Sequence, residues 1–160
     1  MDSPITPTCM EKAGQRGFTM LELMVVVAII AILAALAAPS FNKLILDQRI
    51  KTMAADLNAS LARARSEAVK RNTNVTLTPT GTWQNGWTIA DPNNAGTNIE
   101  SHSGYTGLAA TGPASVTYQS SGRIQGAAVP NINISAPAGS TFRCVAVDLS
   151  GHPYVKPAAC

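Results

Sequence analysis

Glu22 is the one charged side chain in an otherwise apolar stretch, so its chemistry depends on a partner. No charged residue follows it from Leu23 to Ala38, and the short segment beginning at Phe18 leads directly into it. A carboxylate in an apolar helix is costly and normally survives only when it is paired. The sequence therefore predicts an ionic partner for Glu22. The alternative is a carboxylate that reaches the lipid headgroups beside a plain membrane anchor.

The other reactive side chains do not form a recognisable catalytic or metal site. Neither His102 nor His152 has a Cys or His partner at zinc spacing. Asp148, Ser150 and His152 lie too close together along the chain to be read as a catalytic triad. We therefore expect no enzymatic activity, no metal and no cofactor, and we interpret both histidines as surface residues.

The cysteines are divided between the two sides of the apolar stretch. Cys9 lies before it, whereas Cys144 and Cys160 lie far beyond it. Two thiols in an exported domain usually pair, which predicts a disulfide between Cys144 and Cys160, with two free thiols as the alternative. Closing a loop of this size stabilises a fold by about 3 kcal/mol in the chain-entropy model and holds a terminus that otherwise frays.

Basic residues gather in the segment that follows the apolar stretch. The net charge is +3, with the basic excess between Lys43 and Arg71 and a balance of charges from Asn72 to Cys160. A general polyanion-binding surface is not indicated. One cluster, which could belong to a nucleic-acid-binding helix, consists of Arg63, Arg65, Lys70 and Arg71. A solvated helix face or a subunit contact explains this cluster better.

The element that must carry Glu22 is a helix long enough to cross a bilayer. Residues 18–38 would form about 31 Å of helix at about 1.5 Å per residue. A polar leader, Met1–Arg16, is followed at once by Gly17 and Phe18. An ordinary secretory signal instead has a shorter apolar core and its cleavage site after that core. The order of the parts predicts cleavage before the apolar stretch, which stays in the membrane.

Helical periodicity continues beyond Pro39 in an amphipathic form. Apolar residues recur at i, i+3 and i+4 between Phe41 and Val69, and pairs such as Asp47 with Lys51 have helical spacing. Pro39 removes one backbone hydrogen bond, so we expect the helix to bend or loosen there. The helix should end near residue 71, and its apolar face needs a sheet to cover it.

After residue 72 the composition changes to short alternating runs rich in Thr, Val, Asn and Gly, which is typical of strands. The run "TWQNGWTIA" predicts a hairpin with a type I′ turn at Asn85 and Gly86, because both central residues of that turn need positive φ. In such a hairpin Trp83 and Trp87 would pack on one face.

The segment from Asp91 to Gly112 has no periodicity and many turn residues, which predicts a long loop. Its side-chain oxygens could bind calcium, but only one carboxylate precedes Glu100 and the EF-hand spacing is absent. The candidate ligands would be Asp91, Asn93, Asn94 and Asn98.

The stretch "GFTMLELMVVVAIIAILAALAAPSF" resembles the type III signal and N-terminal helix of type IV pilins and type II secretion pseudopilins. The resemblance implies that a prepilin peptidase cuts after Gly17 and methylates the new N-terminal Phe18. It also assigns Glu22 to the glutamate at the fifth mature position. The freed amine would lie one helical turn from Glu22. In a filament this amine could instead meet Glu22 of a neighbouring subunit, which would set the axial register.

A looser resemblance covers the C-terminal half. The runs "WQNGWTI", "YQSSGRI" and "SGHP" are similar to the GspH/FimT family of minor pilins and pseudopilins. Some members of the pilus branch bind DNA through an arginine-rich motif near the C-terminus, where this chain has Gly151 and His152 in "SGHPYVK". The candidate DNA contacts are Arg143 and Lys156. Phosphate binding needs several fixed cations, so the sequence does not favour DNA binding.

The predicted fold class is α+β, with a long N-terminal α-helix packed on an antiparallel β-sheet domain, as the resemblance to type IV pilins implies. The expected divisions are a leader peptide (1–17), a transmembrane and assembly helix (18–39), an amphipathic helix (40–71) and a β domain (72–160). We expect a single-pass protein of the bacterial inner membrane, with a periplasmic C-terminal domain, that later enters a pilus filament.

The predicted function is that of a minor pilin, a structural subunit in the tip or initiating complex of a type IV pilus. Its partners would be other pilins, the prepilin peptidase and the inner-membrane assembly platform. The alternatives are a type II secretion pseudopilin, a DNA-binding minor pilin of natural transformation, and a membrane-anchored enzyme. The residue inventory gives no support to the enzyme.

Overall fold

The computed structural model describes residues 17–126, 128–137 and 141–160. The predicted leader, residues 1–17, therefore lies outside the described residues except for Gly17, and so does Cys9. The chain divides into two compact units, residues 1–39 and residues 40–160, and each is described by itself.

A single helix, α1 (Met20–Arg71), has clear signals at both ends. At its start Thr19 accepts a hydrogen bond from the Glu22 N–H, with 3.2 Å between the Thr19 Oγ1 and the Glu22 nitrogen. At its end Asn72 has a φ of 50°, and the Thr73 N–H donates to the Ala68 carbonyl. This is a Schellman termination, and it places the helix end where the sequence predicted it.

In the first unit the described side chains of α1 are exposed on every side, although most of them are apolar. No single helix in the described part of the chain is long and apolar enough to cross a membrane. The bent pair formed by Met20–Leu36 and Phe41–Arg71 is long and apolar enough when the two parts are taken together.

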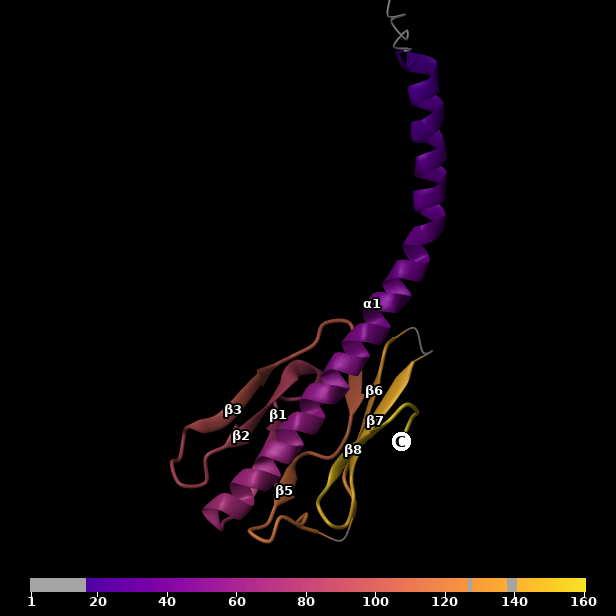
Figure 1. Ribbon diagram of the computed structural model, residues 1–160. Coiled ribbons are helices and arrows are strands. Elements are labelled where there is room, and N and C mark those ends of the chain that lie inside the picture. Colours follow the sequence, from indigo (N-terminus) through magenta and orange to yellow (C-terminus); the bar gives the residue numbers. More distant parts are fainter. Residues whose placement is uncertain (1–16, 127, 138–140) are drawn as a thin grey trace, which may run out of the picture. The chain divides into compact units, whose positions relative to one another are not determined.

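The described residues of the second unit form two antiparallel sheets of four strands each (Figure 1). The first has the order β3-β2-β1-β5 and consists of β1 (Val75–Pro79), β2 (Gly86–Ala90), β3 (Asn98–Ser103) and β5 (Val116–Tyr118). The second has the order β4-β6-β7-β8 and consists of β4 (Ala109–Thr111), β6 (Asn131–Ser135), β7 (Phe142–Val147) and β8 (Pro153–Lys156). The predicted α+β class is confirmed, with two sheets where one was expected.

One face of α1 supplies the centre of the core in this unit. Its fully buried residues recur at helical spacing and are Ile50, Met53, Leu57, Leu61, Ala64 and Ala68. They pack against buried residues of both sheets, among them Leu77, Trp87, Ile89, Val116, Tyr118, Ile132, Ile134, Val145 and Val147. The predicted amphipathic stripe therefore has the sheet cover that it needs.

The long loop predicted from Asp91 to Gly112 is wrong, because β3 and β4 lie within it. The strand β3 pairs only with β2, and its sequence "NIESHS" lacks an apolar alternation. Its one apolar side chain, Ile99, packs against the core, and the contacts of its neighbours are polar or aromatic. Glu100 accepts a hydrogen bond from Ser60 of α1, and the His102 ring stacks on Trp87. A strand that is held by polar contacts does not show the alternation that identifies strands.

The type I′ turn at Asn85 and Gly86 is also wrong. The residues Trp83–Asn85 form a short 3₁₀ helix, η1, and the hairpin joins β1 to β2 with Pro79 opposite Trp87. Trp83 is buried and donates from Nε1 to the Pro113 carbonyl at 2.9 Å, which favours a compact turn before β2. Position 86 requires glycine for a different reason: a Cβ there would lie 2.2 Å from the His102 carbonyl oxygen on β3.

Candidate assembly site

Glu22 lies in the first turn of α1, where its charge has a local explanation. Thr19 and Glu22 occupy the N-cap and third positions of the capping-box pattern T-x-x-E, and the Glu22 N–H bonds to Thr19. The positive end of the helix dipole stabilises a carboxylate at this position. The pattern was visible in the sequence but was not used there. The observed bond caps the helix through the Glu22 backbone N–H, and the helix dipole favours a negative charge in this first turn without a cation of the same subunit.

The apolar side chains that follow Glu22 form an uncovered surface in the first unit. Large apolar residues exposed by more than half of their area include Phe18, Leu21, Met24, Ile30, Leu33 and Leu36. A surface of this kind needs lipid or other helices around it. Gly17 precedes it, and a Cβ added there would have no atom within 4 Å, so the fold itself does not require glycine at that position.

Two segments that belong to the runs "YQSSGRI" and "SGHP" meet at Arg65 of α1. Its Nε donates to the Gly122 carbonyl and its Nη2 to the Ser150 carbonyl, each at 3.1 Å. Gly122 follows β5 in the first sheet, and Ser150 lies in the turn between β7 and β8 of the second. A Cβ at Gly151, whose φ is 85°, would lie 2.0 Å from the Gly122 carbonyl oxygen. The runs "SGR" and "SGHP" are therefore in direct contact.

Asp148, Ser150 and His152 form a turn rather than a triad. The Asp148 Oδ1 accepts hydrogen bonds from the Ser150 N–H, the Ser150 hydroxyl and the His152 N–H, at 2.8, 2.6 and 2.9 Å. The Ser150 hydroxyl and the other donors hold the pKa of Asp148 below its ordinary value. His152 takes part through its backbone. Within the described residues no group of three His, Cys, Asp or Glu is placed to hold a metal ion.

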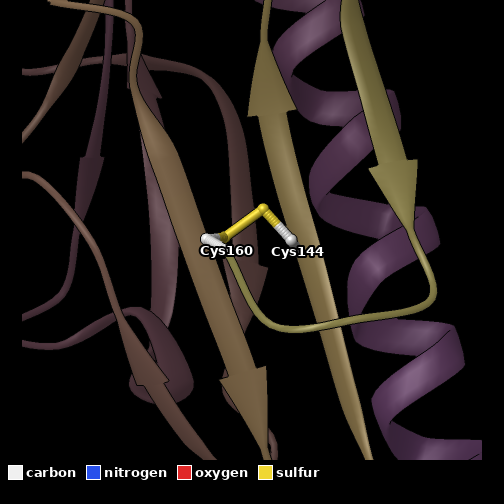
Figure 2. Close-up of a disulfide and its surroundings, with 2 residues drawn as sticks. All are labelled: Cys144 and Cys160. Carbon is white, nitrogen blue, oxygen red and sulfur yellow. A yellow bond between two sulfur atoms is a disulfide. The ribbon is translucent and has the colours of Figure 1, made fainter.

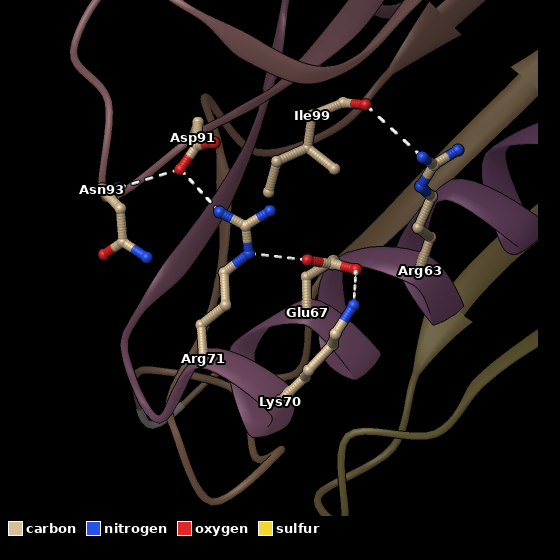
Figure 3. Close-up of polar contacts among 7 residues, drawn as sticks. All are labelled: Arg63, Glu67, Lys70, Arg71, Asp91, Asn93 and Ile99. Atoms are coloured by element: carbon tan, nitrogen blue, oxygen red, sulfur yellow. Dashed lines mark hydrogen bonds and ion pairs between the residues drawn. The ribbon is translucent and has the colours of Figure 1, made fainter.

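The predicted basic cluster at the end of α1 is largely paired with carboxylates (Figure 3). Arg71 joins two of them, with 2.6 Å from its Nε to the Glu67 Oε2 and 2.7 Å from its Nη1 to the Asp91 Oδ1. The hydrogen bond from Arg71 lowers the pKa of Glu67. The pKa of Asp91 is lowered first by the Asn93 N–H and then by Arg71. These contacts fasten the helix to the segment after β2, so they support a structural role over a nucleic-acid-binding one.

The same contacts explain why Asp91 is a poor calcium ligand. Its Oδ1 already accepts hydrogen bonds from Arg71 and from the Asn93 N–H.

His102, which was interpreted as a surface residue in a loop, lies on β3 instead. Its ring stacks on Trp87 with 4.3 Å between the centroids, and its Nε2 is 3.5 Å from the Asp56 Oδ2 of α1. No sequence signal linked these residues, because they come from three different elements.

The two candidate DNA contacts do not form one patch. Arg143 is paired across the strands with Ile134, which is fully buried on the core face of the second sheet. Lys156 is paired with Cys144, the chain neighbour of Arg143. Successive residues of a strand point to opposite faces, and directly paired residues share a face. Arg143 and Lys156 therefore lie on opposite faces of the sheet.

The C-terminus is covalently tied to the second sheet (Figure 2). Cys144 and Cys160 form a disulfide with an S–S distance of 2.09 Å and a Cα–Cα distance of 5.0 Å. Cys144 lies on β7, which has β6 on one side and the edge strand β8 on the other. The bond thus connects Cys160, which follows the edge strand β8, to the inner strand β7.

The sequence matches two family models. Residues 53–151 match the model for type II transport protein GspH, and residues 12–38 match the prokaryotic N-terminal methylation motif. Among curated protein sequences there is no match.

Three solved structures resemble the chain. The crystal structure of the type IV minor pilin FimU of Pseudomonas aeruginosa, strain PAO1, is 21% identical with a TM-score of 0.61, over 71% of this chain and 93% of that one. A second crystal form of FimU is 23% identical with a TM-score of 0.59, over 69% and 96%. The minor pseudopilin EpsH from the Type 2 Secretion System of Vibrio cholerae is 13% identical with a TM-score of 0.53, over 68% and 97%. These similarities show a shared fold.

Proposed function

Because this chain belongs to the GspH family and is a structural subunit of the pilin and pseudopilin kind, we propose that it is a minor pilin of a type IV pilus. In this proposal α1 carries the subunit into the filament, and the subunit occupies the tip or the initiating complex. The observation that carries the proposal is the uncovered apolar surface of residues 18–36 with one carboxylate, Glu22, in the first turn at its head. The role is structural rather than catalytic.

The subunit would be made as a precursor with the leader 1–17 and cut after Gly17 by a prepilin peptidase. Phe18 would become the methylated N-terminus, immediately before the N-cap Thr19. Gly17 makes no contact that the fold needs, which is compatible with a requirement set by the peptidase. Residues 18–39 would hold the protein as a single pass in the inner membrane, with residues 72–160 in the periplasm.

Assembly would then bring the freed amine of Phe18 close to Glu22 of a neighbouring subunit. The cap at Thr19 is compatible with this view, because its hydrogen bond comes from the Glu22 backbone N–H and does not involve the carboxylate. An amine and a carboxylate that pair in an apolar surrounding attract each other strongly and fix the register of the helices. The partners are accordingly other pilins, the prepilin peptidase and the inner-membrane assembly platform.

Glu22→Ala tests this assignment. We expect incorporation into sheared filaments to fall at least about tenfold, which corresponds to about 1.4 kcal/mol, because the neighbour's amine loses its partner. Immunoblots of sheared filaments and of membranes measure the incorporated fraction. Asp47→Asn is the matched control, since Asp47 lies on the same helix beyond the apolar surface and pairs with Lys51. Unchanged incorporation of Glu22→Ala would show that Glu22 does not set the register.

Processing is measured independently by intact mass. The expected mature chain begins at Phe18 and carries one added methyl group. A protein that still includes residues 1–17 in cells with an active prepilin peptidase would contradict the cleavage, whatever the result for Glu22.

A second candidate is a pseudopilin of type II secretion. It is favoured by the matched family, whose description is a type II transport protein, and by the fold shared with EpsH. Deletion of the gene separates the two candidates. Loss of surface pili with normal secretion supports the pilus, whereas loss of secreted enzymes with normal pili supports the secretion system.

A further inference from the structure

A groove of about 680 Å³ lies beside the point where Arg65 joins the two turns. One wall is the face of α1 that carries Ala62, Ser66 and Val69. The other is formed by the turn residue Gly122 and by Pro153, the first residue of β8. Its lining is completed by Asn58, Arg65, Lys70, Ser121 and His152. The groove is therefore formed by α1, by the turn after β5 of the first sheet and by the start of β8 in the second, all within the second unit.

The groove has a positive electrostatic character. Arg65 and Lys70 line it, and no Asp or Glu is found among the described residues of its lining. The hydrogen bonds of Arg65 go to the neutral carbonyls of Gly122 and Ser150, so they do not cancel its charge. The Lys70 side chain is 74% exposed, and its Nζ lies 3.8 Å from the Glu67 Oε1. An exposed ion pair of this length contributes little, so Lys70 can exchange this partner for another carboxylate.

The walls of the groove are held in place before anything binds. The close contact of Gly151 with Gly122 and the two bonds of Arg65 fix both turns against α1. A Cβ at Gly122 would lie 3.0 Å from a methyl group of Val69, so this wall packs tightly on the helix. Val69 is nevertheless 54% exposed and offers an apolar contact at the rim. A preformed site of this kind loses little entropy when it is occupied.

We propose that the groove binds an extended, carboxylate-bearing segment of a neighbouring subunit in the filament. A carboxylate would lie between Arg65 and Lys70, and an adjacent apolar side chain would contact Val69. Charge complementarity of this type selects the partner and its orientation. A nucleic acid fits less well, because it needs a long track of cations, and Lys156 lies elsewhere, on the outer face of the second sheet. This inference rests on the proposed function of the chain as a filament subunit.

The test uses the full-length protein in cells that assemble filaments. A photo-crosslinking amino acid replaces Val69, and the crosslinked peptides in sheared filaments are identified by mass spectrometry. We expect one segment of another subunit that contains Asp or Glu. Lys70→Glu should lower the crosslink yield about tenfold, and reversing the charge of the crosslinked acid to Lys should restore it.

Two variants keep the test interpretable. Lys156→Glu makes the same change in net charge on the outer face of the second sheet and should leave the yield unchanged. Lys70→Gln avoids a new carboxylate beside Glu67, and it should give an intermediate yield at an unchanged melting temperature.

Crosslinks to lipid, to DNA or to a segment without acidic residues would overturn the inference, as would equal yields for Lys70→Glu and Lys156→Glu in incorporated subunits. A chain that is absent from all sheared filaments would overturn the proposed function, and this inference with it. The two failures are thus distinguished by the filament fraction.

Discussion

Arg65 illustrates how one side chain can connect elements that are distant in sequence. Its planar guanidinium donates to two carbonyls, at Gly122 and Ser150, that belong to turns of different sheets. In the sequence Arg65 belongs to a basic cluster for which nucleic acid was one possible partner. The structure gives it neutral acceptors instead, which satisfy two backbone groups at a crowded junction.

Arg65→Met should lower the free energy of unfolding of the second unit by about 2 kcal/mol, the range for hydrogen bonds to a charged donor. Arg65→Lys should lose nearly as much, because an ammonium cannot reproduce the two-pronged geometry. Denaturant unfolding of a fragment spanning residues 40–160 measures both. The control, Arg123→Met, removes an exposed cation one residue after Gly122 and should cost less than about 0.5 kcal/mol. Equal losses for Arg65→Met and Arg123→Met would contradict this account.

At the scale of elements, the end of α1 is attached to the segment between β2 and β3 by ionic contacts. Arg71 is the central residue, with Glu67 one turn earlier on the helix and Asp91 immediately after β2. The helical pair was predictable from its i, i+4 spacing. The contact to Asp91 was not, because it depends on how the first sheet is placed under the helix.

These contacts predict a loss of stability in acid. The folded-state pKa values of Glu67 and Asp91 lie below their ordinary values of 4.5 and 3.8, so in this range the unfolded chain binds more protons. Their contribution is fully present above the ordinary values and is lost as the pH falls through the lowered ones. We expect unfolding curves to shift to lower denaturant below about pH 4.5.

Arg71→Gln should make this acid dependence shallower, because it removes a cause of both shifts. Some dependence will remain from Asp148, whose pKa is lowered by a separate turn. Acid profiles of wild type and variant that coincide would show that Arg71 does not stabilise the two carboxylates.

At the scale of the whole molecule, the disulfide attaches the C-terminal residues to the second sheet. Cys160 is exposed, but its sulfur is bonded to Cys144, which is 2% exposed on an inner strand. The last residues are therefore fastened to β7, the strand beside β8, and β8 is the edge of the second sheet. An edge strand with a free tail beside it would be the first part of this sheet to open.

Replacing both Cys144 and Cys160 with Ser should lower the free energy of unfolding by about 3 kcal/mol, as expected for a closed loop of this size. Thermal unfolding of the second unit gives the comparison, and reduction of the wild-type protein should reproduce the shift in melting temperature. A reduced protein that melts with the oxidised one would rule out this contribution.

The sequence alone determined the features that local chemistry encodes. The C-terminal end and amphipathic face of α1, the position of Glu22 and the alternating character of the C-terminal half follow from patterns a few residues long. Hydrophobic period and capping preferences act between neighbours along the chain, so they are visible without a fold.

The tertiary structure decided everything that depends on strand order and register. It made strands of residues 98–103 and 109–111, stacked His102 on Trp87, and brought Gly122 against Gly151. It also placed Arg143 and Lys156 on opposite faces of one sheet. A shift of one residue in pairing turns every side chain of a strand to the other face, and no local pattern encodes the partner strand. Such contacts exist only once the long-range pairing is set.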